Sequence, residues 1–163
     1  ASIVETNVVG ALYGSKVALA GMRRQGFGAL YNMEGFGSRG RQFRTGLTPY
    51  GTTKAAVRYL TEALAREERG SSLVVGSISP GMVVTDLLLG PYRDHPEELA
   101  SVRKVFNVLA DKVETVAPWI VSRILANEKT GVRIAWLTTP KVLGRFLRAP
   151  FARRDVLSPG SPS

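Results

Sequence analysis

The chain has 163 residues, of which 44% are apolar, so it is long and apolar enough to bury a sizeable core. It contains no cysteine, which excludes disulfides and thiolate metal sites. Its net charge of +9 favours anionic partners. The basic residues are not interleaved with aromatic ones, so no nucleic-acid partner is expected. No apolar run is long enough to cross a bilayer.

The N-terminal pattern predicts an amphipathic helix over residues 3–22, because apolar side chains recur mostly with i, i+3 and i+4 spacing. Part of its surface is smooth, with small residues at Gly10, Ala11, Gly14, Ser15 and Ala18. We expect this surface to pack closely against a sheet or a partner helix. Residues 28–33 then predict a short buried strand, and residues 34–49 a Gly- and Arg-rich connection.

The rest of the chain continues to alternate helices and strands. A second helix is predicted from Thr48 to about Arg69, followed by a strand over residues 71–78. After the break at Pro80-Gly81, residues 83–96 are expected to form a loop with some apolar character. Two helices, a third strand and a short last helix are predicted at 96–111, 116–127, 131–138 and 140–147.

This alternation predicts parallel strands joined by helical crossovers, and therefore an α/β fold. Three strands make a small sheet, whereas a parallel sheet is normally covered on both faces and does not end at an open edge. We therefore expect residues 1–155 to form the C-terminal half of a doubly wound, parallel-sheet, Rossmann-type fold. Residues 156–163, rich in Ser, Pro and Gly, are predicted to be a disordered tail.

One glycine pattern imitates a dinucleotide-binding motif. Residues 35–40 match G-x-G-x-x-G after a predicted strand, and Glu62 lies about twenty residues further on. A true motif opens a helix whose N-terminus faces the pyrophosphate, whereas residues 41–49 have no helical period and contain helix breakers. We therefore interpret residues 35–40 as a loop that brings Ser38 into an active site.

A tyrosine and a lysine four positions apart open the second predicted helix. Tyr50 and Lys54 share one helical face, so a phenol and an ammonium lie together there. The spacing alone is a weak signal, but the order of the motifs around it is specific. Along the chain these are Asn7, the Gly-rich loop with Ser38, the Tyr-x-x-x-Lys pair, and Pro80-Gly81 with Thr85.

This order resembles the short-chain dehydrogenase/reductase family, over residues 1 to about 138. The resemblance implies that residues 1–155 are the catalytic half of such a domain. It implies that Tyr50 is the general acid for carbonyl reduction and that Lys54 holds the nicotinamide ribose. The charge of Lys54 is expected to lower the pKa of Tyr50 from its usual value of about 10. Asn7 would support a water relay to the lysine.

Further site residues follow from the same resemblance. The family expects a serine directly after the strand, where this chain has Gly35. Ser38, twelve residues before Tyr50, is therefore assigned as the hydrogen-bond donor to the substrate carbonyl, with a solvated loop hydroxyl as the alternative. The expected nicotinamide contacts are Pro80, Gly81, Val83 and Thr85. No metal is expected, because no second type of ligand clusters with the single histidine, His95.

Within this family the chain resembles the chlorophyll b reductase branch. The distinctive part is the acid-Gly-x-Gly-Ser sequence of residues 34–38, in place of the usual Ser-Ser. The resemblance implies a chloroplast, thylakoid-associated enzyme of chlorophyll catabolism. With NADPH, or NADH as the alternative, it would reduce the 7-formyl group of chlorophyll b or chlorophyllide b to hydroxymethyl, and Tyr50 would protonate the alkoxide.

Two alternatives stay open. The chain reduces another hydrophobic carbonyl compound, or it is a non-catalytic, truncated remnant that acts as a binding subunit, since it has no phosphate-binding glycine turn.

The resemblance also suggests uses for other segments. In a reductase of chlorophyll b or of another carbonyl compound, the segment 92–111 would lie where the family places a substrate lid. The mixed basic and apolar stretch 145–154 is suited to peripheral contact with an anionic membrane, with a solvated basic tail as the alternative. Homo- or hetero-oligomer contacts are expected through helices 3–22 and 50–69.

Overall fold

The computed structural model describes residues 2–151 and 154–157. The chain forms two compact units, and each has its own sheet. The first unit consists of Ala1–Ser79 and Ile124–Ile134, and the second of Pro80–Arg123 and Ala135–Ser163. The residues predicted to form a single domain are therefore divided between two bodies, with the change from the first to the second directly after Ser79.

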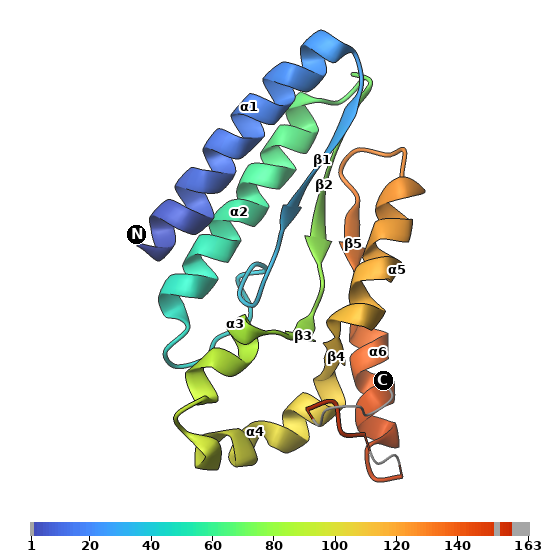
Figure 1. Cartoon of the computed structure of the whole chain (residues 1–163). Helices are drawn as coiled ribbons and strands as arrows, with labels where there is room; N and C mark the ends of the chain where they lie inside the picture. The colour runs from blue at the N-terminus through green and yellow to red at the C-terminus, as the bar shows by residue number, and fades with distance from the viewer. Residues whose placement is uncertain (1, 152–153, 158–163) are drawn as a thin grey trace. The chain divides into compact units, whose positions relative to one another are not determined.

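The first unit is built on a sheet with the strand order β1-β2-β5. β1 (Gly28–Met33) and β2 (Leu73–Ser79) are parallel, in register from Gly28 opposite Leu73 to Met33 opposite Ile78 (Figure 1). β5 (Arg133–Ala135) lies on the other side of β2. The predicted α/β class with a parallel sheet is confirmed, although the third strand is shorter than residues 131–138.

Two long helices pack against β1 and β2 (Figure 1). The first begins as a π-helical turn, η1 (Glu5–Val9), continues as α1 (Gly10–Gln25) and ends at Gly26, whose φ of 84° suits glycine. The second, α2 (Thr48–Glu67), has Pro49 in its first turn, where a missing N–H costs nothing. Their contact with the sheet is formed by Leu19, Ala65, Leu73 and Val75. Both predicted helices are confirmed, but the π-helical turn was not predicted.

The second unit begins with a short strand, β3 (Met82–Val84), which pairs in parallel with β4 (Ala110–Lys112). The connection between them is helical, with α3 (Asp86–Leu89), η2 (Gly90–Tyr92) and α4 (Pro96–Leu109). The prediction of a loop over residues 83–96 is therefore wrong for the end of β3, for α3 and for η2. The Thr85 hydroxyl caps α3 by accepting from the Leu88 N–H at 3.4 Å, which is a local signal for a helix start.

The remaining elements of the second unit are α5 (Val113–Leu125), most of which lies in this unit, and α6 (Thr139–Arg148). Its core gathers around Phe106, Ala110 and Val156. Val156 is only 3% exposed and belongs to this core. The prediction of a disordered tail from residue 156 is therefore wrong at its first residue. Residues 158–163, where the rest of that tail was predicted, lie outside the described residues. Within the described part of the chain, no helix combines the length and apolar character needed to span a membrane.

Candidate functional site

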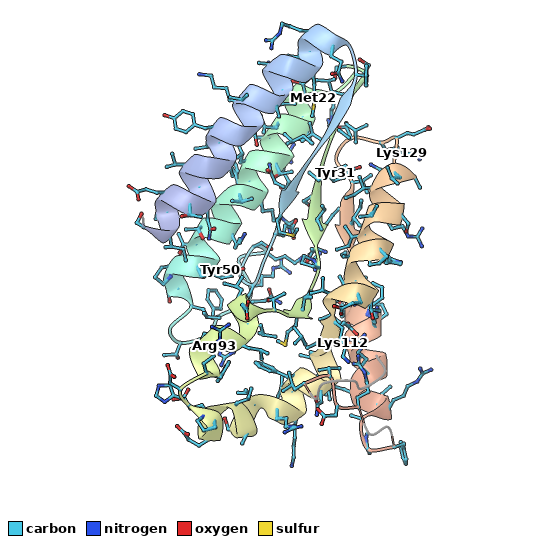
Figure 2. The ribbon with its side chains drawn as sticks, viewed as in Figure 1. Met22, Tyr31, Tyr50, Arg93, Lys112 and Lys129 are labelled. Carbon is cyan, nitrogen blue, oxygen red and sulfur yellow. The ribbon has the colours of Figure 1, made fainter. Side chains whose placement is uncertain are left out.

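Tyr50 and Lys54 lie in the first turns of α2, where Figure 2 labels Tyr50. Lys54 reaches the carboxyl end of β1. The Lys54 Nζ donates a hydrogen bond to the carbonyl of Met33, the last residue of β1, at 3.2 Å. It lies 5.7 Å from the centre of the Tyr50 ring. The structure therefore brings the predicted phenol and ammonium together, and it ties the ammonium to the strand end.

The loop after β1 contacts the start of α2 through two glycines. A Cβ atom on Gly35 would overlap the Tyr50 hydroxyl and would lie 3.1 Å from the Tyr50 Cζ. A Cβ atom on Gly37, whose φ is 85°, would lie 2.6 Å from the Cα of Gly51. The phenol of Tyr50 therefore occupies space that a side chain at residue 35 would need.

Asn7 is tied to the same turn of α2. Its Nδ2 donates to the Thr53 hydroxyl at 3.0 Å, and that hydroxyl donates to the Tyr50 carbonyl at 2.7 Å. Asn7 lies inside the π-helical turn η1, and such turns are frequent at functional sites. The structure thus links Asn7 to the Tyr50 carbonyl through two hydrogen bonds, with the Thr53 hydroxyl between them.

Ser38 is buried, with 5% of its surface exposed, so the alternative of a solvated loop hydroxyl is wrong. Its hydroxyl donates to the carboxylate of Glu34 at 3.2 Å. A serine hydroxyl has a single proton to donate, and here that proton is used inside the protein. The sequence analysis did not single out Glu34 as a site residue, although it begins the acid-Gly-x-Gly-Ser sequence.

A family model described as short chain dehydrogenase matches residues 1–94. This chain belongs to that family. A solved structure of a short-chain type dehydrogenase/reductase from Mycobacterium ulcerans has the same fold, with a TM-score of 0.66 and 28% identity. The match covers 86% of this chain and 50% of that one.

Curated relatives within the family are similar over most of this chain. It is 39% identical over 145 residues to a probable chlorophyll(ide) b reductase NYC1, chloroplastic, from Oryza sativa subsp. japonica, with 86% of this chain and 27% of the relative covered. It is 34% identical over 133 residues to chlorophyll(ide) b reductase NOL, chloroplastic, from Arabidopsis thaliana, with coverages of 79% and 36%. The chain thus spans about a third or less of the length of these relatives.

The protonation of this short-chain dehydrogenase site is set by burial. Burial raises the pKa of Tyr50 above its ordinary value of 10.0 and lowers the pKa of Lys54 below 10.5. Both shifts arise because desolvation disfavours the charged form of each group. The expectation that Lys54 lowers the pKa of Tyr50 is therefore wrong for this structure. Tyr50 is a neutral phenol at neutral pH, which is the form that can donate a proton.

We expect Tyr50 to ionise above pH 10.0, later than an exposed tyrosine. Because the folded protein holds this proton more tightly than the unfolded chain, the stability from Tyr50 is present below pH 10.0 and is lost as the pH rises through the folded value. The ultraviolet titration of tyrosinate in the wild type, minus that of Tyr50→Phe, isolates this phenol. A midpoint at or below 10.0 would contradict the expected burial.

The residues predicted to contact the nicotinamide lie in the second unit. Val83 is in β3, and Thr85 caps α3. Gly81 has a φ of 75°, and a Cβ atom there would contact the side chain of Leu137. Pro80 and Gly81 thus form a turn whose shape requires glycine, directly before β3.

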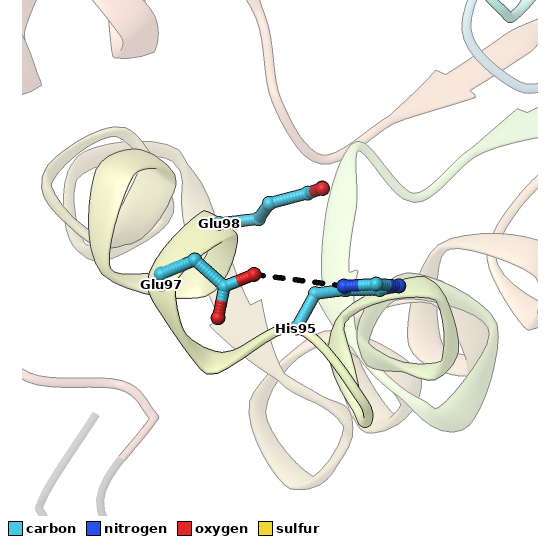
Figure 3. A group of neighbouring side chains, drawn as sticks. All are labelled: His95, Glu97 and Glu98. Carbon is cyan, nitrogen blue, oxygen red and sulfur yellow. Dashed lines mark ion pairs between the residues drawn. The ribbon is translucent and has the colours of Figure 1, made fainter.

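His95, Glu97 and Glu98 form an exposed group at the start of α4 (Figure 3). One potential ligand atom from each lies within 4.8 Å of the others, and the His95 Nδ1 is 3.5 Å from a Glu97 carboxylate oxygen. The statement that no second ligand type clusters with His95 is therefore wrong. All three side chains are exposed, and exposed acidic groups of this kind are common without an ion. We assign this group no metal role.

Proposed function

We propose that this protein is an NADPH-dependent reductase that converts the 7-formyl group of chlorophyll b or chlorophyllide b to hydroxymethyl in chlorophyll catabolism. One observation carries the chemistry: a neutral, half-buried phenol at Tyr50 lies one helical turn from the Lys54 ammonium. The substrate class is supported by the relatives named chlorophyll(ide) b reductase. Since those relatives are chloroplastic, we propose the same compartment, with attachment to the thylakoid.

The residues of the first unit fit a nicotinamide cofactor. The Lys54 ammonium has three N–H donors, and within the described chain one of them is used, by the Met33 carbonyl. The others suit the ribose hydroxyls of the cofactor. When bound, the nicotinamide supplies the hydride. In our proposal Pro80, Gly81, Val83 and Thr85 hold its carboxamide end.

The residues of this chain supply the proton. As the formyl carbon gains a hydride, its oxygen gains negative charge, and the Tyr50 hydroxyl donates its proton to that oxygen. In our proposal, Asn7 then supports the return of a proton to Tyr50 through water. Because the Ser38 proton is donated to Glu34, we propose that Ser38 supports the loop and does not bind the substrate carbonyl.

The proposal is tested by incubating the protein with NADPH and chlorophyll b in detergent. Loss of the formyl pigment is followed by absorbance and chromatography, with NADH in a parallel reaction. Formation of the 7-hydroxymethyl pigment supports the proposal. NADPH binding without conversion contradicts the substrate, and a panel of hydrophobic aldehydes and ketones then tests the alternative reductase. Failure to bind either cofactor favours the non-catalytic binding subunit.

Gly35→Ala is expected to lower kcat at least about tenfold, because the added methyl group displaces the Tyr50 hydroxyl from its position. The same substitution at Gly21, in α1, is the control, since a Cβ atom there has no neighbour within 4 Å. Steady-state kinetics of both variants measure the difference. Equal kcat values for Gly35→Ala and the wild type would contradict the close contact with Tyr50.

We propose that α1 and α2 pair with a second copy of this chain. α1 exposes Leu12, Tyr13 and Val17, with 72% of Val17 accessible. A groove of about 520 Å³ between the two helices is lined by Leu12 and Tyr13, together with the charged residues Lys16, Arg23 and Glu67. Both signs of charge in one groove suit a two-fold copy of itself. Sedimentation equilibrium tests this, since a monomer at all concentrations would contradict it.

We also propose that α6 and the residues after it rest on an anionic membrane surface. Arg145 of α6 turns inward, where it pairs with Asp111, whereas Leu143, Leu147 and Phe151 are 61%, 68% and 91% exposed. Residues 139–154 contain five Lys or Arg and no acidic residue. An exposed apolar face beside cations is typical of interfacial helices. Flotation with vesicles tests this, since equal binding to anionic and purely zwitterionic vesicles, or none, would contradict it.

A further inference from the structure

Glu34 is a buried carboxylate that the proposed reaction does not use for proton transfer. Its side chain is 1% exposed, directly after β1. One oxygen accepts from the Ser77 hydroxyl at 2.8 Å. The other accepts from the Ser38 hydroxyl at 3.2 Å and from the Arg133 Nε at 2.7 Å. The three donors come from β2, from the loop after β1 and from β5, so one side chain joins three segments.

Such a carboxylate is held in place by its partners. A buried charge is costly unless it is both paired and hydrogen-bonded. Arg133 supplies the opposite charge, and the two serines occupy further lone pairs. The Glu34 N–H also donates to the Ile78 carbonyl at 2.7 Å, which fixes the backbone of the same residue to β2. Glu34 therefore anchors the beginning of the loop to the sheet at both its backbone and its side chain.

The end of β1 and the loop after it have partners on two sides. The Met33 carbonyl accepts from Lys54, Gly35 lies against the Tyr50 hydroxyl, and Gly37 lies against Gly51. These odd-numbered residues contact α2. In between, Glu34 points to β2 and β5, where Ser38 also contributes its hydroxyl. The loop therefore separates the Glu34 carboxylate, which contacts β2 and β5, from the Tyr50 and Lys54 pair of α2.

We propose that Glu34 is a positioning residue: its hydrogen bonds to Ser38, Ser77 and Arg133 hold Gly35 against the Tyr50 hydroxyl and so set where the phenol points. This inference rests on the proposed reductase function for its catalytic consequence. Its structural content is the coupling between the Glu34 carboxylate and the Tyr50 phenol, which can be measured without substrate.

The first measurement follows Tyr50 directly. The protein is labelled with ¹³Cζ-tyrosine, which gives five signals for its 5 tyrosines, and the Tyr50 signal is identified by its loss in Tyr50→Phe. Glu34→Gln removes the charge from the anchor. Ser77→Ala removes one hydrogen bond and no charge. In both variants we expect the Tyr50 signal to move and its titration midpoint to fall toward 10.0, because a looser loop buries the phenol less.

A matched control separates positioning from a general loss of stability. Glu68 is 4% exposed and pairs with Arg23, in the same unit but at the opposite end of α2 from Tyr50. Glu68→Gln therefore also removes a buried carboxylate from a partly buried ion pair, and we expect the Tyr50 signal to stay in place. The inference is overturned if Glu34→Gln moves Tyr50 no more than Glu68→Gln does. It is also overturned if Ser77→Ala leaves Tyr50 unchanged, because the effect of Glu34→Gln would then be one of charge alone.

The second measurement is kinetic. Glu34→Gln is expected to lower kcat about tenfold through misplacement of the phenol, with a small change in KM, whereas Glu34→Asp, which keeps the charge, recovers part of the loss. Glu68→Gln is expected to retain the wild-type kcat. If the wild type reduces no carbonyl substrate, the proposed function fails, and the tyrosine signals still decide whether Glu34 positions Tyr50. If Glu34→Gln keeps the wild-type kcat, the positioning role is wrong.

Discussion

Tyr50→Phe is expected to lower kcat for carbonyl reduction by about 10²- to 10⁴-fold, the usual contribution of a positioned general acid. The substitution removes one hydroxyl from a phenol that is neutral at neutral pH, and it keeps the ring that Lys54 approaches to 5.7 Å. Since the ring and the helix are retained, we expect KM for the pigment and the affinity for NADPH to change little. We therefore expect the decrease in kcat to arise from the proton-transfer step.

The same helix offers a matched control for this prediction. Tyr59 is also in α2, is 74% exposed and lies outside the contacts described for Tyr50. Tyr59→Phe removes an identical hydroxyl and is expected to leave kcat at the wild-type value. Steady-state kinetics with NADPH and chlorophyll b, together with a fluorescence titration of NADPH binding, separate turnover from binding. Undiminished kcat in Tyr50→Phe would remove Tyr50 from the role of acid and would require another proton donor.

The alkaline limb of the pH profile gives a second view of the same group. Reduction needs the protonated phenol, so the ionisation of Tyr50 should lower activity only above the raised pKa of that group. Lys54 works in the other direction, because burial lowers its pKa and the ammonium is lost earlier than in an exposed lysine. A fall in activity that begins below pH 10.0 is therefore attributed to Lys54. The residual activity of Tyr50→Phe should show the same fall, because this variant keeps Lys54.

Local patterns in the sequence predicted the parts of the molecule that local chemistry determines. The Tyr50 and Lys54 pair follows from helical spacing, and the structure places both in one helix beside a strand end. The bounds of the strand over residues 28–33 are confirmed to the residue, because the left-handed Gly26 ends the helix before it. The prediction that this strand is buried is wrong, since each of its residues is at least partly exposed. The G-x-G-x-x-G match at residues 35–40 is confirmed as a loop.

Features that depend on distant partners were not predictable in the same way. The strand β4 is three residues long and exists through its pairing with β3, 28 positions earlier in the chain. In the sequence, Glu34 is an ordinary acidic residue of a loop. Its hydrogen bonds come from Ser77 and Arg133, which are 43 and 99 residues away along the chain. The predicted direction of the shift in the Tyr50 pKa was wrong for the same reason, because the shift depends on burial that only the folded chain provides.

A second buried carboxylate holds the other unit together. Asp111, in β4, is 2% exposed and accepts a hydrogen bond from the Trp136 Nε1 at 2.6 Å. Arg145 and Arg154 both pair with it at 2.8 Å, and the side chains of the two arginines are 17% and 28% exposed. One carboxylate thus pairs with two cations and connects β4 to α6 and to the segment that follows it.

Asp111→Asn is expected to destabilise the second unit by about 3 kcal/mol, because it leaves two partly buried guanidinium groups close together without a counter-charge. Asp86→Asn is the control. Asp86 is 93% exposed at its side chain and pairs with the exposed Arg93, so its loss should cost at most about 1 kcal/mol. Both substitutions remove one negative charge from the same unit, and they differ in the burial of the carboxylate and in the number of its partners.

Tryptophan fluorescence in urea is suited to this comparison. The chain has 2 Trp, and both lie in the second unit, where Trp119 packs edge-on against Trp136 at 5.2 Å. The signal therefore reports the unit that contains Asp111, even if the first unit unfolds in a separate transition. The lost Trp136 hydrogen bond should also shift the emission of the folded Asp111→Asn protein. Equal urea midpoints for Asp111→Asn and Asp86→Asn would show that the two arginines do not need the buried carboxylate, and that α6 is held by its apolar contacts alone.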